Sequence, residues 1–123
     1  MTKNNIFEFI LLFFSITLGG FDFAIKLTVF LLVMDTVTGV LANMGNLKSS
    51  VFIKGICKKI YILIIISLAY NIGKLINMDL RNVTVGFYIF YEALSIIENG
   101  DKLGVPIPKK LKNILKSEVE KNE

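Results

Sequence analysis

Two short series of polar and small residues interrupt otherwise apolar stretches of this sequence, and their residue types could do chemistry. The six residues are Asp35, Thr38, Gly39, Glu92, Ser95 and Asn99. Spacings of three, four and seven place each series on one face of a helix. An ionised side chain at the depth of a membrane costs at least ~2.5–3.5 kcal/mol on insertion scales. Such groups therefore need partners from neighbouring helices or from water.

Two roles fit these polar faces. Small residues let helix backbones approach, and hydroxyls and amides form hydrogen bonds between helices, so the faces can pack helices together. Alternatively, they line a water-filled lesion after many copies assemble, where Asp35 and Glu92 would be solvated. The same faces could do both in turn. All six residues are therefore candidates for oligomerisation or for lining a lumen. Lys74 is a weaker candidate partner for an acid, and it also suits the outer membrane interface.

Enzyme chemistry finds little support in this sequence. Histidine is absent, which removes the commonest general base and metal ligand. Ser49 and Ser50 have no histidine to activate them and are typical of a turn or helix cap. We find no phosphate-binding glycine loop, no cluster with metal-ligand spacing and no nucleophile–base pair. We therefore predict no enzymatic activity, no cofactor and no metal site.

The composition indicates an integral membrane protein. Hydrophobic residues make up 54% of the 123 residues, against ~45–50% in soluble domains. The stretches 27–34 and 60–70 contain no charged residue, whereas a surface helix of a soluble protein needs a charged face. The net charge is +4, and the lysines flank the apolar blocks. This pattern favours anionic lipid over nucleic acid as the partner.

The predicted fold class is an all-α membrane protein with four hydrophobic helices. The expected spans cover about 6–21, 23–44, 60–76 and 83–97, within a transmembrane domain over 1–100. The fourth is marginal, since ~15 residues cover only about 22 Å. A basic cytoplasmic tail over 101–123 follows, with a short amphipathic helix that rests on the inner membrane surface or frays into solvent.

Basic residues predict the topology. With four spans, 11 of the 14 lysines and arginines fall on one side of the membrane and 3 on the other. The positive-inside rule then places both termini and the central link in the cytoplasm. Six lysines are expected to set this topology and bind lipid headgroups: Lys54, Lys58, Lys59, Lys109, Lys110 and Lys112. The segment 51–56 is expected to lie along the headgroup layer.

At these motifs the chain resembles the toxin-secretion/phage-lysis holins, the group that includes the clostridial TcdE-like holins. The stretch 34–40 (MDTVTGV) matches the aspartate-x-x-threonine-glycine signature of that family. The family's serine–glycine–double-lysine loop is matched over 49–59, its glutamate-x-x-serine element over 90–99, and its glycine-x-proline-x-proline over 104–108. The resemblance covers roughly 27–116. At 71–74, where the family often has an aspartate, this sequence has none.

The resemblance implies a holin that oligomerises in the bacterial cytoplasmic membrane and opens lesions. Its partners would be the lipid bilayer, copies of itself and, indirectly, an endolysin or a secreted toxin. Two alternatives stay open. One is a small ion channel or transporter, which needs a defined ion site. The other is a membrane scaffold or antiholin that makes no hole.

Overall fold

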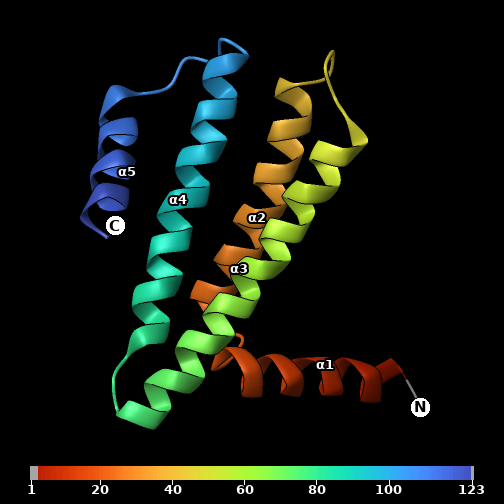
Figure 1. The fold of residues 1–123 in the computed structure, drawn as a ribbon, viewed down its shortest axis with the longest axis vertical. Coiled ribbons are helices and arrows are strands. Elements are labelled where there is room, and N and C mark those ends of the chain that lie inside the picture. Colours follow the sequence, from red (N-terminus) through yellow and green to blue (C-terminus); the bar gives the residue numbers. More distant parts are fainter. Residues whose placement is uncertain (1–2, 123) are drawn as a thin grey trace.

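The computed structural model describes residues 3–122, and this part of the chain is built from helices alone. Their bounds are Lys3–Leu18 (α1), Phe23–Ala42 (α2), Ser49–Ile76 (α3), Leu80–Lys102 (α4) and Lys109–Lys121 (α5). Figure 1 shows α2, α3 and α4 as an up-down-up bundle, with α1 crosswise at one end and α5 folded back along α4. The closest packing is between α2 and α4.

Local sequence chemistry fixes where the bundle helices begin and end. Asp22 caps α2 by accepting a hydrogen bond from the backbone N–H of Ile25 at 3.1 Å, and Asp79 caps α4 in the same way. Aspartate suits both positions because its carboxylate satisfies a free N–H of the first turn. Asn77 ends α3 in the left-handed conformation, which asparagine tolerates better than most residues.

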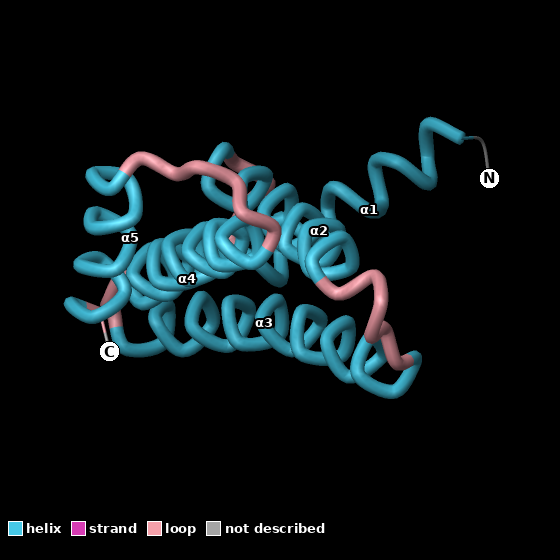
Figure 2. The backbone as a smooth tube through the Cα atoms, turned by 90° about the horizontal axis from the view of Figure 1, so that it is seen from above, coloured by secondary structure: helices cyan, strands magenta, loops and turns pink. Residues whose placement is uncertain are grey.

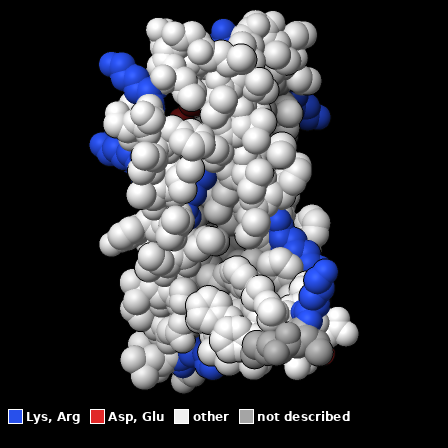
Figure 3. Space-filling view, turned by 90° about the vertical axis from the view of Figure 1, so that its right-hand side faces the viewer, with Lys and Arg blue, Asp and Glu red and all other residues white. Residues whose placement is uncertain are grey.

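The core of the bundle is small, and most of the apolar surface faces outward. The buried core residues are Leu18, Ile25, Leu32, Ile62, Ile66 and Val85. Large apolar side chains stay exposed along the outside of every helix, such as Phe30, Leu68 and Val83. The face in Figure 3 is mostly uncharged, with scattered basic groups and almost no acidic ones. A soluble monomer rarely exposes so much contiguous apolar surface, so the surroundings that suit this bundle are apolar.

The helices differ from the predicted spans in several ways. Among the described residues, α2 is the helix that is long and apolar enough to cross a membrane, so four hydrophobic spans are not confirmed. The predicted 83–97 segment belongs to a 23-residue helix about 34 Å long, because the Asp79 cap starts it earlier. Helix α3 begins at Ser49, so 51–56 is its first part rather than a separate surface segment. The predicted 6–21 span corresponds to α1, which lies across the bundle (Figure 2).

Helix α5 confirms the predicted C-terminal amphipathic helix, and it packs on protein. Leu115 and Val119 are buried where α5 meets α4, and Lys112 forms an ion pair with Asp101 of α4. Pro108 immediately precedes its first turn. The tail is therefore neither frayed nor free to turn this apolar face toward lipid.

Candidate functional site

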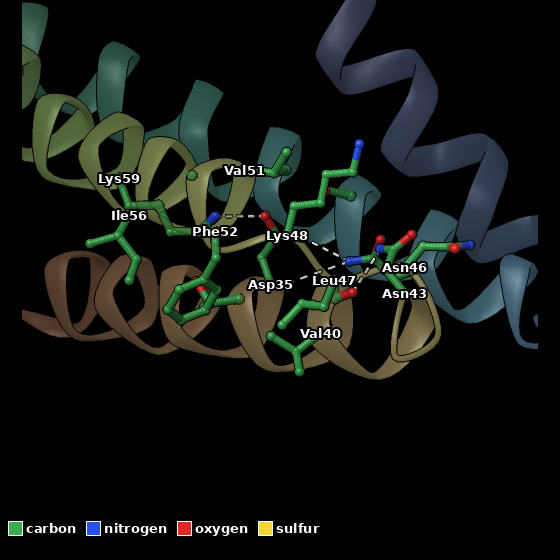
Figure 4. A pocket seen from close by; sticks show the side chains of 15 residues that line it. Asp35, Val40, Asn43, Asn46, Leu47, Lys48, Val51, Phe52, Ile56 and Lys59 are labelled. Carbon is green, nitrogen blue, oxygen red and sulfur yellow. Dashed lines mark hydrogen bonds and ion pairs between the residues drawn. The ribbon is translucent and has the colours of Figure 1, made fainter.

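The bundle encloses one ammonium group between two carboxylates. Lys59 Nζ of α3 lies 2.6 Å from Asp35 Oδ2 of α2 and 3.1 Å from Glu92 Oε2 of α4. Glu92 is 2% exposed, and the other two side chains are largely covered. Figure 4 shows the Lys59 and Asp35 side chains pointing toward each other between their helices. We call Asp35, Lys59 and Glu92 the charge cluster.

Asn99 extends the charge cluster toward the end of α4. Its Nδ2 donates to Asp35 Oδ1 at 3.2 Å and to Thr38 Oγ1 at 3.0 Å. Thr38 can accept this bond because its own hydroxyl donates to the carbonyl of Met34 at 2.8 Å. A Cβ at Gly39 would stand 3.7 Å from Asn99 Nδ2, so Gly39 lies in this same interface. The network therefore joins α2 to α4 by side chains that satisfy one another.

The structure brings the predicted polar faces together within one chain. Asp35 and Thr38 of α2 meet Glu92 and Asn99 of α4 through the contacts given above, and Ser95 lines the cavities beside them. These contacts are those expected of helix packing, the first of the two roles considered. Their role in oligomerisation or in lining a lumen stays a prediction.

Lys59 has surroundings that differ from those expected from the sequence. The sequence predicts that both Lys58 and Lys59 bind headgroups, but Lys58 is exposed whereas Lys59 is half-buried. Lys59 lies three and seven residues before Ile62 and Ile66, both of which are buried. Residues at these spacings share a helix face, and that signal could have identified Lys59 as inward-facing. The partners of Lys59 are 24 and 33 residues away.

The other lysines predicted to bind headgroups have different surroundings. Lys54, Lys58, Lys109 and Lys110 are exposed, as headgroup binding requires. Lys112 is half-buried and pairs with Asp101. Exposure leaves the first four available to lipid, while the ion pair fixes α5 on α4.

A cavity of about 330 Å³ adjoins the charge cluster between the end of α2 and the start of α3. Its lining includes the polar residues Asp35, Lys59 and Asn99 and the apolar residues Val51 and Phe52. Among residues 3–122, no group of histidine, cysteine and acidic side chains is arranged to hold a metal ion. The cavity can accept water or a small polar group next to the ion pairs.

The charge cluster has an energetic consequence. The cluster holds two carboxyl groups and one ammonium group inside the bundle. A buried ion pair contributes little net stability, but removing one partner leaves an uncompensated charge and costs ~3–5 kcal/mol. Breaking the contacts of the cluster is therefore costly, although the intact cluster adds little to the stability of the bundle.

A second ionic contact, unforeseen from the sequence, lies at the opposite end of the bundle. Arg81, at the start of α4, bonds both carboxylate oxygens of Asp22 at 2.9 and 3.0 Å. Its Nε also donates to the carbonyl of Leu18 at 2.5 Å. The hydrogen bond from Arg81 lowers the pKa of the Asp22 carboxyl below its usual value. We call Arg81, Asp22 and the Leu18 carbonyl the elbow clamp, because they hold the turn between α1 and α2.

Fold and site together define an all-helical, membrane-associated protein with charges enclosed in an apolar bundle. The chain belongs to the bacteriophage holin family, whose model matches residues 12–118. That family is not one of enzymes.

Relatives cover nearly the same length. The uncharacterised protein Lmo0128 of Listeria monocytogenes is 35% identical over 106 residues, 83% of this chain and 76% of that protein. An uncharacterised 14.9 kDa protein in the nagH 3′ region of Clostridium perfringens is 34% identical over 108 residues, 84% of this chain and 82% of that protein. The uncharacterised protein YtkC of Bacillus subtilis is 25% identical over 103 residues, 80% and 77% of the two chains. No solved structure matches.

Proposed function

We propose that the chain is a holin that oligomerises in the bacterial cytoplasmic membrane and opens lesions. Through them a cell-wall hydrolase or a toxin would leave the cell. The observation that carries this proposal is the charge cluster: charged groups are enclosed in a bundle whose outside is apolar. In a closed protomer within lipid, these charged groups are paired with one another. Once the bundle opens, water can hydrate them.

The proposed topology has three spans, α2, α3 and α4. Helix α3 contributes the charge-free stretch 60–73, and α1 lies across the bundle instead of beside it (Figure 1). Lys59 lies in the charge cluster. Nine of the other thirteen basic residues lie in the α2–α3 link, in α3 before Lys59, or in the chain from Lys102 onward, and four lie at the other end. The positive-inside rule puts the nine in the cytoplasm with the C-terminus. The N-terminal end of α1 then lies at the outer side, whereas the four-span prediction places it in the cytoplasm.

In the proposed mechanism, each copy enters the membrane with its charge cluster paired. Copies accumulate and associate through their apolar and small-residue faces. When the helices of neighbouring copies separate and repack, Asp35, Lys59 and Glu92 become hydrated and line the opening. The free energy lost by breaking the paired cluster is offset by solvating three charges, because water satisfies ions better than an apolar bundle does.

The direct test is expression of this chain alone in a bacterium. A holin first abolishes the membrane potential and then releases a co-expressed cytoplasmic cell-wall hydrolase. A non-permeabilising scaffold or antiholin leaves both unchanged, and that result would overturn the proposal.

The charge cluster gives a residue-specific test. Asp35→Leu and Glu92→Leu are expected to insert at normal levels but to lose or mistime permeabilisation. Glu98→Leu is the matched control, since Glu98 lies on the exposed side of the same helix as Glu92. Unchanged leakage kinetics in both cluster variants would refute the role of the cluster.

A selective ion channel is the second candidate, favoured by the charge cluster and the 330 Å³ cavity beside it. Release from liposomes by size separates the two functions. A channel passes small ions and retains a protein-sized dextran, whereas a holin lesion releases both.

A further inference from the structure

Helix α1 is an apolar arm that the protein itself barely covers. Every side chain from Lys3 to Ile10 is exposed, including Phe7 at 62% and Phe9 at 61%, and Ile16 farther along is 63% exposed. It packs against the bundle mainly through α3, near its C-terminal half, where Phe14 packs against the core and Leu18 is buried. Arg81 of α4 also bonds the Leu18 carbonyl. Figure 2 shows its N-terminal part projecting away from the bundle.

The direction of the arm is fixed at its base. Gly19 has a φ of +81°, and a Cβ there would meet the ring of Tyr70 at 2.6 Å, so this turn requires glycine. The elbow clamp then ties the last turn of α1 and the cap of α2 to Arg81, which is 7% exposed. A buried guanidinium with bidentate carboxylate contacts is a geometrically specific connection. The arm is therefore held outward rather than hanging loosely.

Lying flat at the membrane surface does not explain the arm. An interfacial helix needs an apolar face toward the acyl chains and a strongly polar face toward water. From Ile6 to Leu18, α1 has only Glu8, Ser15 and Thr17 as polar residues, and Thr17 spends its hydroxyl on the carbonyl of Phe13. A helix that is apolar on every side is enclosed by protein or by the hydrocarbon of a membrane.

The charged residues of the arm and of the bundle indicate which surface covers the arm. Glu8 is the only acidic residue of the arm, it is exposed, and it makes no ion pair among the described residues. At the base of the bundle, Lys26 and Lys74 are also exposed and lie over the rings of Phe21 and Tyr70 rather than beside a carboxylate. The arm, 16 residues long, extends about 24 Å, roughly two helix diameters. The arm is therefore long enough to reach the base of an adjacent bundle, and Glu8 pairs with neither lysine of its own chain in the described structure.

We propose that α1 of one copy packs against the base of the neighbouring copy's bundle, with Glu8 paired to Lys26 or Lys74 there. This inference rests on the proposed function, because it names the surface through which copies would assemble. The contact is heterologous: each copy offers an arm and a base. Such contacts close into rings or grow without end, and either outcome gives an assembly that can surround or border an opening.

A photo-crosslinking amino acid tests which molecule touches the arm. The full chain is reconstituted in liposomes with p-benzoylphenylalanine at Phe9, or at Phe14 as the matched control that faces its own core. At Phe9 we expect a ladder of covalent dimers and larger species that grows with protein density. At Phe14 we expect crosslinks within one chain. Lipid adducts alone at Phe9 would overturn the inference.

Charge exchange tests the pairing. Glu8→Lys is expected to reduce the Phe9 crosslinked dimer about tenfold, the loss that corresponds to ~1.4 kcal/mol. Combining it with Lys26→Glu or Lys74→Glu restores the dimer for the lysine that makes the pair. Glu118→Lys, an acid on α5 far from the arm, is the control for net charge. No loss with Glu8→Lys, or no rescue by either lysine variant, would remove Glu8 from the contact.

The two proposals fail separately. If Phe9 crosslinks only lipid while the chain still releases the hydrolase, the holin function stands and the arm contact is wrong. If crosslinked ladders form but no release or depolarisation occurs, the arm contact stands and the holin function is wrong.

Discussion

Lys59 and Lys58 are neighbours in sequence with opposite surroundings, which makes them a matched pair. Lys59→Leu leaves two carboxylates facing each other without a cation, so we expect a loss of stability on the order of 3 kcal/mol. Lys58→Leu should change stability by less than about 0.5 kcal/mol, because Lys58 is exposed. Denaturant titration in mild detergent, followed by circular dichroism, measures both. Equal effects of the two substitutions would contradict the role of the charge cluster.

A triple replacement tests whether charge or shape matters at the cluster. Asp35→Leu, Lys59→Leu and Glu92→Leu together remove all three charges, so no ion is left unpaired. We expect this variant to be at least as stable as the parent chain, since apolar side chains often replace buried ion pairs without loss. Its release activity should nevertheless be absent, because hydration of the cluster is the proposed driving force. A triple variant that still releases the hydrolase would contradict that mechanism.

The contact between Asp22 and Arg81 should make the stability of the protein depend on pH. The pKa of Asp22 is lowered by Arg81, so its contribution is fully present above the unfolded value of ~3.9. It is lost as the pH falls through the lower, folded-state pKa. The acid-induced loss of stability below about pH 4 should therefore be smaller in Asp22→Asn, which starts from a weaker elbow. Thermal unfolding in detergent across pH 2–6 checks this, and identical profiles for the two proteins would count against the clamp.

Among the helices, the turn from α3 to α4 depends on Gly73. A Cβ there would run into the carbonyl oxygen of Met78, the residue whose own N–H bonds the Gly73 carbonyl at 2.9 Å. Gly73→Ala should therefore destabilise the bundle by about 1–3 kcal/mol, the range for overpacking. Gly55→Ala is the control: nothing lies within 4 Å of the added carbon, so alanine should stabilise α3 by ~0.5–1 kcal/mol. The same titration reads out both, and a loss at Gly55 instead would contradict this assignment.

The sequence predicted the elements better than their directions. Apolar runs identify helices over most of α2, α3 and α4, and the spacing of Asp35 and Glu92 with their series correctly put each set on one face. The crosswise direction of α1 was not predictable in this way. It depends on the backbone of Gly19 and on Arg81, whose contact with Leu18 spans 63 residues, and periodicity carries no information about a contact made at such separation.

For the whole molecule, two groups of charged residues lie in different places. The charge cluster lies between the bundle helices, while the elbow clamp holds the arm at one end. In the proposed function these have different tasks. The arm joins copies while the charge cluster stays enclosed. The cluster becomes hydrated only when the joined bundles rearrange. Assembly and opening are then separable steps, so a variant can fail at one and complete the other.

The topology of the whole chain distinguishes three spans from four. In a Cys57→Ser background, single cysteines replace Asn4, Met78 or Asn46, all of which are exposed. Cells at low expression, before the membrane potential falls, receive a membrane-impermeant maleimide. Three spans place residues 4 and 78 outside, so both are labelled, while residue 46 reacts only after permeabilisation. Four spans leave residue 4 protected with residue 46. Because only residue 4 differs between the two, its labelling shows whether α1 crosses the membrane or lies at its outer side, where it can reach the next copy.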